Sequence, residues 1–222
     1  MFRKLALKAN YSSEADNLYE DFFVPVLSQA TVYKRAVGYF SLGVLLNAPA
    51  AMAHLVEANG RVEIIFGKLV ALSDFEAIRE GLINPWDGAE LPSFADLIAE
   101  HPASLLSYRI RMLAWLFANE RLEMKVALRP EGLFHQKIGI FEDRLGDHIS
   151  FSGSMNETIS ALDPRYNSEE ISVFRSWKEG QCEYADSHRA NFETLWSGET
   201  GSATIVTSIP EAIASGLRFI AE

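Results

Sequence analysis

The sequence has very little cysteine and no long uncharged apolar run. Its 222 residues include a single cysteine, Cys182, so no disulfide can form within the chain, which suits a reducing compartment. No run of 18 apolar residues is free of charge, and the N-terminal stretch holds no long apolar segment of the kind that secretion signals carry. These absences predict a cytoplasmic protein that does not enter a membrane.

Positive charge is also scarce. Twenty Lys and Arg residues stand against thirty Asp and Glu residues, which gives a formal net charge of −10 at pH 7. Binding to a polyanion requires Lys and Arg on the contact face, so this balance argues against broad, sequence-independent affinity for nucleic acid. Two local clusters, Lys34–Arg35 and Arg109–Arg111, are the candidates for phosphate contacts, although a solvated helix face is the simpler reading of the second.

Apolar residues, by contrast, are plentiful enough to build a core, at 48% of the chain. Short β-branched runs alternate with helical periodicity, and we find no internal repeat or linker. We therefore expect one domain over residues 1–222, an α/β fold with a mixed β-sheet flanked by helices on both faces. Strands are expected at 31–40, 61–67, 122–128, 133–141, 148–153 and 168–176, and helices at 14–29, 42–58, 93–119, 155–162 and 181–196, with another after Ser73.

Two polar residues share one expected strand. His135 and Lys137 are two positions apart, so their side chains emerge on the same face of the sheet. Ile138 and Ile140 then point to the opposite face, into a core. A lysine placed among apolar neighbours requires a polar partner, which makes this pair the first candidate for a functional site.

Further polar residues follow on the next two expected strands. Ser152, Ser154 and Asn156 have the same parity at the end of one strand, and Glu169 opens the next. If these strands pair, all of these groups converge with the His–Lys pair on one rim of the sheet. The other histidines show no partner spacing and are expected to be structural or exposed.

This set of side chains suits the cleavage of a phosphodiester. The imidazole of His135 can attack phosphorus and form a phosphohistidine, while Lys137, Ser154 and Asn156 supply donors for the phosphate oxygens. A carboxylate such as Glu169 can fix the imidazole tautomer. No step requires a metal or a cofactor, but a second histidine must protonate the leaving alkoxide.

Three short motifs in this order resemble a known signature. HQK at 135–137, GSMN at 153–156 and NSE at 167–169 are similar to the HxK, GSxN and NxE motifs of the phospholipase D superfamily. The surrounding GLFHQKIGIF, SGSMNET and NSEEISVFRSW look like the phospholipase D-like nuclease domains found with superfamily 2 helicases in restriction and antiviral defence systems. The resemblance covers most of the chain. It implies an endonuclease that hydrolyses DNA, or another nucleic acid, without a metal.

The chain departs from that signature at one position and leaves another open. The family places an Asp five residues after the Lys, whereas this sequence has Glu142 followed by Asp143. We expect this position to support the structure and not to act in catalysis. Both Glu169 and Glu170 could be the histidine's partner, and the NxE spacing favours Glu169.

The chain carries one such motif where the chemistry needs two. The resemblance implies that single-motif members form homodimers, so we expect a C2 dimer through the active-site face, with both His135 side chains in one composite site. One imidazole would be the nucleophile and the other the general acid.

Two other functions remain open from the sequence. The chain could be a weakly catalytic or non-catalytic dimerisation or DNA-sensing module of a larger defence complex, with a helicase domain in cis or in trans; residues 1–222 would then be the N-terminal part of a longer protein. A lipid phosphodiesterase ranks third, because no basic amphipathic surface helix or lipidation signal is evident.

Overall fold

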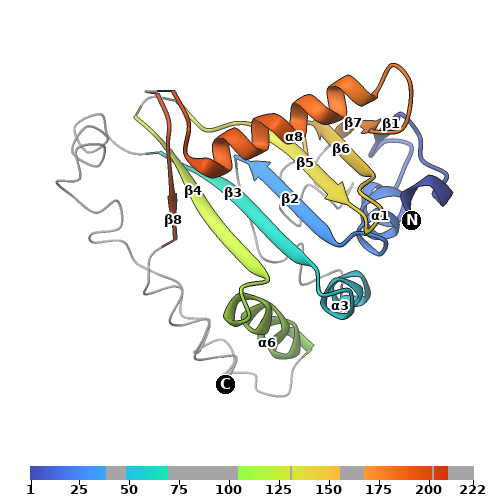
Figure 1. Cartoon of the computed structure of the whole chain (residues 1–222), viewed down its shortest axis with the longest axis horizontal. Helices are drawn as coiled ribbons and strands as arrows, with labels where there is room; N and C mark the ends of the chain where they lie inside the picture. Colours follow the sequence, from blue (N-terminus) through green and yellow to red (C-terminus); the bar gives the residue numbers. More distant parts are fainter. Residues whose placement is uncertain (39–48, 70–104, 131, 156–167, 202, 210–222) are drawn as a thin grey trace.

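A computed structural model of the chain describes residues 1–38, 49–69, 105–130, 132–155, 168–201 and 203–209. Its centre is one eight-stranded mixed sheet with the order β1-β7-β6-β5-β2-β3-β4-β8 (Figure 1). The strands are β1 (Asn10–Ser12), β2 (Val32–Val37), β3 (Arg61–Leu69), β4 (Leu122–Arg129), β5 (Lys137–Glu142), β6 (His148–Gly153), β7 (Glu170–Arg175) and β8 (Ile205–Ser208).

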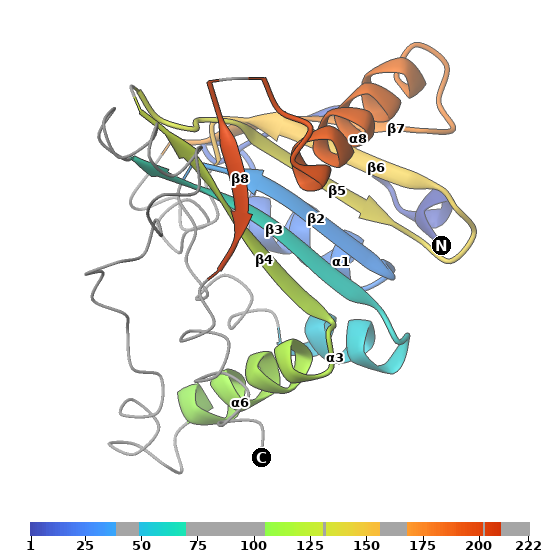
Figure 2. The same ribbon diagram turned by 60° about the vertical axis from the view of Figure 1, so that its left-hand side comes forward.

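Helices cover both faces of this sheet (Figure 2). Helix α8 packs on β2, β5, β6 and β7 from one side, while α1, α3 and α6 belong to the core on the other side. The helices are η1 (Phe2–Lys4), η2 (Leu18–Phe23), α1 (Val24–Leu27), α3 (Pro49–Glu57), α6 (Leu105–Ala118) and α8 (Cys182–Ser197). The predicted α/β fold, with a mixed sheet flanked by helices on both faces, is confirmed.

Strand directions bring several chain segments to one end of the sheet. Strands β2, β3 and β4 are parallel, β5 runs antiparallel to β2, and β6 and β7 alternate in direction after it. The ends of β2 and β6 therefore lie beside the starts of β5 and β7. We call this end of the sheet the site rim, because the candidates His135, Lys137, Ser154 and Glu169 lie at or near it.

Each face of the sheet has its own apolar core. On the side of α1, the core is the larger one, and in it Tyr33 and Phe141 stack with centroids 4.7 Å apart. On the side of α8, the core is smaller, with Ile65, Ile140 and Phe192 among its buried members. The alternation of β5 between these cores sets which of its side chains face which helix.

Several expected elements differ in detail. The predicted helix 14–29 is shorter: Asn17 caps η2, a π-helix, by accepting from the N–H groups of Tyr19 and Glu20, and α1 then ends at Leu27. The predicted strand 133–141 begins only at Lys137. The edge strands β1 and β8 were not expected. Residues 156–162 of one expected helix, the expected helix after Ser73, residues 42–48 of another and residues 93–104 of the helix expected at 93–119 lie outside the described residues.

Candidate active site at the site rim

His135 is placed by its buried neighbour. The segment before β5 crosses the site rim, and Phe134 anchors it by inserting into the core beneath α8, where 4% of its surface stays exposed. Gly67 on β3 makes room for the crossing, because a Cβ there would lie 2.9 Å from the carbonyl oxygen of Phe134. His135 follows and is exposed. The imidazole is thus held on a fixed segment while its ring remains accessible.

The predicted His–Lys pair is in direct contact. The Nζ atom of Lys137 lies 2.8 Å from Nε2 of His135. An ammonium group can only donate, so Nε2 accepts and Nδ1 carries the ring proton. The lone pair of Nε2 is therefore engaged by the ammonium, and it becomes free when Nζ donates to another acceptor. Lys137 itself is buried, as expected for a lysine among apolar strand residues.

Ser154 links the end of β6 to the start of β7. Its hydroxyl donates to Oε2 of Glu169 and accepts from the N–H of Glu170 at 3.0 Å, while its own N–H donates to the Glu170 carbonyl at 3.0 Å. Gly153 permits this close approach, because a Cβ at that position would lie 2.0 Å from the Glu170 carbonyl oxygen. The turn at 153–155 is therefore fixed onto the strand that carries the carboxylate.

The two candidate carboxylates differ sharply in environment. Glu169 is 6% exposed, and its backbone is held by Ser13, which accepts from its N–H at 2.8 Å and donates to its carbonyl at 2.9 Å. Glu170 is exposed, and Asn10 donates to its Oε1 at 2.7 Å. Burial beside Ser154 makes Glu169 the better candidate for a functional carboxylate. The predicted contact between Glu169 and the imidazole stays a prediction.

The charged groups of the rim influence one another. The pKa of the Lys137 ammonium is lowered from its usual value, first by burial and then by the positive charge of Arg35, while the negative charge of Glu169 acts in the opposite direction. Lys137 therefore lies within electrostatic reach of both groups. His135, Lys137, Ser154 and Glu169 come together at one rim, as the sequence predicts.

Not every expected member of the group joins it. Ser152 pairs with Ile138 across β5 and β6, and registered partners share a face of the sheet. Ser152 therefore lies on the α8 face, away from Lys137, and its predicted place at the rim is wrong. The parity argument fails because the chain leaves β6 after Gly153 and turns Ser154 toward β7. Asn156 and the Asn167 of the third motif lie outside the described residues.

Glu142, which stands where the family motif has Asp, and the neighbouring Asp143 both make structural contacts, as expected. Glu142 lies on the α8 face, where its Oε1 is 3.8 Å from Nζ of Lys34. Asp143 is buried and accepts from the backbone N–H groups of Phe2, Leu145 and Asp147, which closes the turn after β5. Both carboxylates stand at the end of β5 far from the site rim.

The predicted basic cluster Lys34–Arg35 is not a surface patch. Lys34 is 4% exposed beneath α8, where it contacts the carboxylates of Glu63, Glu142 and Glu193. Arg35 is fully buried on the opposite face. The expectation of phosphate contacts at this pair is therefore wrong. Alternation along β2 sends the two charges to opposite faces, and both are covered.

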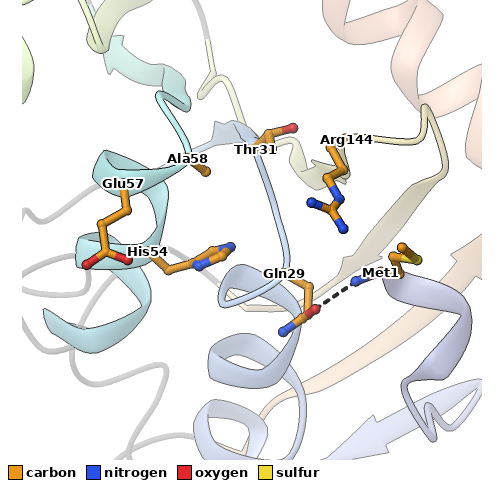
Figure 3. Close-up of a pocket in the computed structure, with 7 residues that line it drawn as sticks. All are labelled: Met1, Gln29, Thr31, His54, Glu57, Ala58 and Arg144. Atoms are coloured by element: carbon orange, nitrogen blue, oxygen red, sulfur yellow. Dashed lines mark hydrogen bonds between the residues drawn. The ribbon is translucent and has the colours of Figure 1, made fainter.

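The remaining described histidines have other surroundings. His188 Nδ1 contacts the hydroxyl of Ser150 at 2.9 Å, and His148 Nε2 lies 3.1 Å from Asp186. His54 lines a cavity of about 470 Å³ with Gln29 and other residues, and Figure 3 shows it pointing toward Arg144. This cavity lies where β2 begins and β5 ends, so it is remote from the site rim.

Within the described parts of the chain, no three His, Cys, Asp or Glu side chains are grouped so that they could hold a metal ion. Helices with the length and apolar character of a membrane span are likewise not found there.

Sequence reasoning passed over two residues that hold this group. Ser13 fixes the backbone of Glu169, and Arg35 lies near Lys137. A signal for Arg35 was present, because VYKRAV places an arginine at the same parity as the aromatic Tyr33 of a buried strand. Nothing in the sequence around Ser13 indicates its contact with Glu169.

Comparison with protein-family models gives no match, and comparison with curated proteins gives none either. Solved structures with a similar fold include NucT from Helicobacter pylori, at 15% identity and a TM-score of 0.45 over 88% of this chain and 97% of that one. Nuc from Salmonella typhimurium, described as a phospholipase D family member, is similar at 14% identity and a TM-score of 0.46 over 90% and 98% of the two chains.

A phosphatidylserine synthase from Haemophilus influenzae is similar at 16% identity and a TM-score of 0.44, over 96% of this chain and 44% of that one. A member of the family that the motifs resemble is thus among the similar folds. Likeness at this level concerns the fold and not the chemistry.

Proposed function

We propose that this chain is a phosphodiesterase that hydrolyses DNA without a metal, through a phosphohistidine on His135. The contact of 2.8 Å between His135 Nε2 and Lys137 Nζ carries the proposal. It supports the proposal because the imidazole and the ammonium are close enough to engage one phosphoryl group, with Nζ donating to the phosphate and releasing the Nε2 lone pair for attack. Ser154 and Glu169 at the same rim supply a hydroxyl and a carboxylate for the remaining tasks.

The reaction divides into two displacements at phosphorus. In the first, the Nε2 lone pair of His135 forms a bond to phosphorus, the bond to the leaving oxygen breaks, and a second imidazole gives that oxygen a proton. In the second, the same imidazole takes a proton from water, the resulting hydroxide attacks phosphorus, and the bond to Nε2 breaks. The enzyme returns to its starting state, and the products are an alcohol and a phosphomonoester.

The polar groups around His135 stabilise the charge that develops. Lys137 offers a cation to the equatorial oxygens, and the Ser154 hydroxyl can turn from Glu169 to the substrate. Glu169 is proposed to hold the Nδ1–H side of the imidazole, and Asn156 to donate to the phosphate. The roles of these two residues rest on the motif resemblance together with the burial of Glu169.

The second imidazole is proposed to come from a second copy of the chain. His135 is exposed at the site rim, so a twofold axis there can bring the two rings to opposite sides of one phosphate. The dimer interface would then include the active-site face. Leu133, two residues before His135 and 46% exposed, lies on the same segment and suits such a contact.

A second candidate function is a dimerising, DNA-sensing module within a helicase or defence complex. Burial of Lys34 and Arg35 favours it, because it removes two cations from the face that a polyanion would touch. Because the chain has a net charge of −10 and repels a polyanion, a partner or a further domain would then hold the nucleic acid. Binding without turnover of any diester would support this function over the first.

The decisive experiment compares three proteins in EDTA. Wild type, His135→Ala and the matched control His54→Ala are incubated with plasmid, with oligonucleotides and with a generic chromogenic phosphodiester. We expect wild type and His54→Ala to cleave and His135→Ala to lose activity by at least about 10³-fold. Acid-labile, alkali-stable phosphate should be trapped on His135. Activity that survives in His135→Ala, or that chelation abolishes, contradicts the proposal.

The composite site has its own test. Light scattering should give a dimer, and mixed dimers of wild type and His135→Ala should lose most of their activity, since each site needs two histidines. An active monomer, or mixed dimers with half of the wild-type rate, would contradict the shared site while leaving the nucleophile in place.

A further inference from the structure

Three neighbouring strands align three residues in one row across the sheet. Phe151 on β6 is registered with Gly139 on β5, and Gly139 is registered with Arg35 on β2. All three face the core on the side of α1. The next row toward the site rim contains Lys137, whose partner on β2 is Val37. Arg35 therefore lies one row below Lys137 on the same face.

The glycine in the middle of the row brings the outer two side chains together. A Cβ on Gly139 would lie 2.1 Å from Cε1 of Phe151, so the phenyl ring occupies the space that a side chain would take. The ring crosses β5 in this way and reaches the Arg35 guanidinium, whose Cζ lies 4.8 Å from the ring centroid. A planar guanidinium over a ring face is a favourable cation–π contact, and it fixes the plane of the arginine fork.

The arginine also holds the turn that carries Ser154. Its Nη2 atom donates to the carbonyl oxygen of Met155, and Arg35 and Met155 are 0% and 1% exposed. The contact joins residues 120 positions apart, from β2 to the segment after β6. Because Arg35 is fully buried, it has no direct access to a substrate, and its contact is with the turn that carries Ser154.

A packing role alone does not require a charge at this position. Removing a guanidinium from water costs free energy that an apolar side chain of similar volume avoids. Here the charge has two defined effects at the rim. The guanidinium donates a hydrogen bond to the Met155 carbonyl in the 153–155 turn. Its positive charge also lowers the pKa of the Lys137 ammonium, although burial lowers that pKa more and Glu169 raises it.

We propose that Arg35 is a positioning residue of the active site, which fixes the 153–155 turn through the Met155 carbonyl and places a permanent positive charge beneath Lys137. This inference rests on the proposed function. Gly139 and Phe151 contribute to this positioning, because the Phe151 ring fills the space above Gly139 and sets the position and plane of the Arg35 guanidinium. Lys137 thereby receives a cationic neighbour from a residue that substrate does not touch.

The test uses Arg35→Gln, Arg35→Lys and the control Lys34→Gln. Lys34 is the adjacent residue on β2 and is also buried, but on the opposite face. Its replacement therefore shows the effect of losing a buried charge from β2 without a direct change at the rim. Three quantities are measured: the methyl resonance of Met155, the titration of the Lys137 ammonium by NMR of labelled lysine, and kcat and KM on a diester as a function of pH. Met155→Leu and Lys137→Arg assign the two resonances.

For Arg35→Gln we expect kcat to fall roughly 10- to 100-fold with little change in KM, because the 153–155 turn, which carries Ser154, loses its fixed position. The Met155 methyl resonance should shift, and the Lys137 titration midpoint and the basic limb of the rate profile should move to higher pH. Arg35→Lys should return the titration toward wild type, since it keeps the charge, but recover kcat only in part. Lys34→Gln should leave Met155 and Lys137 as in wild type.

Unchanged Met155 and Lys137 signals in folded Arg35→Gln overturn the inference and leave Arg35 a packing residue. If Arg35→Gln does not fold, the Met155 resonance of Arg35→Lys decides: a wild-type position contradicts the inference. If the wild-type protein cleaves no diester, the proposed function fails, while the two NMR measurements still decide the role of Arg35.

Discussion

The hydroxyl of Ser154 donates to the carboxylate of Glu169 and accepts the N–H of Glu170 at 3.0 Å. One side chain thus joins the turn after β6 to the first residues of β7, and it does so beside the His135–Lys137 contact. A hydroxyl that both donates and accepts has little freedom to rotate, so in the free protein its O–H is held toward Glu169. It must turn from that carboxylate before it can donate to a phosphate oxygen, and it can then stabilise the charge that develops there.

Replacing Ser154 should therefore affect activity and stability separately. Ser154→Ala removes a donor to the phosphate and leaves the Glu170 N–H without its acceptor. We expect kcat to fall about 10²- to 10³-fold and the free energy of unfolding to fall by about 1–2 kcal/mol. Steady-state kinetics and urea unfolding measure the two effects.

A double-mutant cycle with Glu169→Gln tests whether the two side chains act as a unit. Because they share one hydrogen bond, the losses in kcat should be clearly less than additive. Glu170→Gln is the control, since that carboxylate is exposed and bonded to Asn10. Fully additive losses in kcat would show that Ser154 and Glu169 act independently.

The charge of Glu169 should also appear in the pH dependence of the rate. The carboxylate raises the pKa of Lys137, against burial and Arg35, which lower it. Removing the negative charge in Glu169→Gln lowers that pKa further, so Lys137 loses its proton at a lower pH. The basic limb of kcat/KM should therefore move to lower pH, which is the opposite direction to that expected for Arg35→Gln. A basic limb that stays in place in both variants would show that Lys137 does not set it.

Gly139 should be one of the least replaceable residues of β5. An added Cβ meets the Phe151 ring at 2.1 Å, and the ring is confined by Phe22, whose centroid is 5.2 Å away. We expect Gly139→Ala to lower the free energy of unfolding by about 1–3 kcal/mol, and to lower kcat because the ring no longer fixes Arg35. Gly201→Ala is the control, since a Cβ there meets nothing within 4 Å. Equal stability of the two variants in urea would contradict this.

The sequence predicts the contact between His135 and Lys137, although the reason differs: β5 begins only at Lys137, so His135 lies before the strand and alternation does not place it. It also predicts that Ser154 and Glu169 approach them, since antiparallel strands that follow one another in the chain usually pair. It fails for Ser152, where the chain leaves its strand one residue later. Parity holds only inside a strand, and the residue at which a strand ends depends on contacts such as that between Gly153 and the Glu170 carbonyl.

Other parts of the site depend on contacts that no local pattern records. Strand β1 has three residues, too few for a period, yet it leads to the Ser13 that holds Glu169. The surroundings of Arg35 follow from the pairing of β2 with β5, which lies about a hundred residues later in the chain. Lys34–Arg35 therefore reads as a basic cluster in sequence, although the sheet buries the two charges on opposite faces.

Two histidines outside the site should make the protein less stable in mild acid. Burial lowers the pKa of His188, and burial followed by the Arg189 charge lowers that of His148, although Asp186 opposes the shift. Both therefore bind protons more weakly in the folded state than in the unfolded state, where the pKa is about 6.5. Their contribution to stability is fully present above about pH 6.5 and is lost as the pH falls below it, toward the lower folded pKa values.

The variant His188→Gln tests this sign. Glutamine keeps a polar partner for the Ser150 hydroxyl, which lies 2.9 Å from Nδ1 of His188, but it does not titrate. Urea unfolding between pH 7.5 and 5 should show the wild-type free energy of unfolding falling, with at most about 1.4 kcal/mol per pH unit from each histidine. The fall should be smaller in His188→Gln, because one of the two protons is no longer taken up on unfolding. Identical slopes in the two proteins would mean that His188 is equally easy to protonate in the folded and unfolded states, and that its neighbours, which include the Phe174 ring with its centroid 5.4 Å away, do not disfavour its charged form.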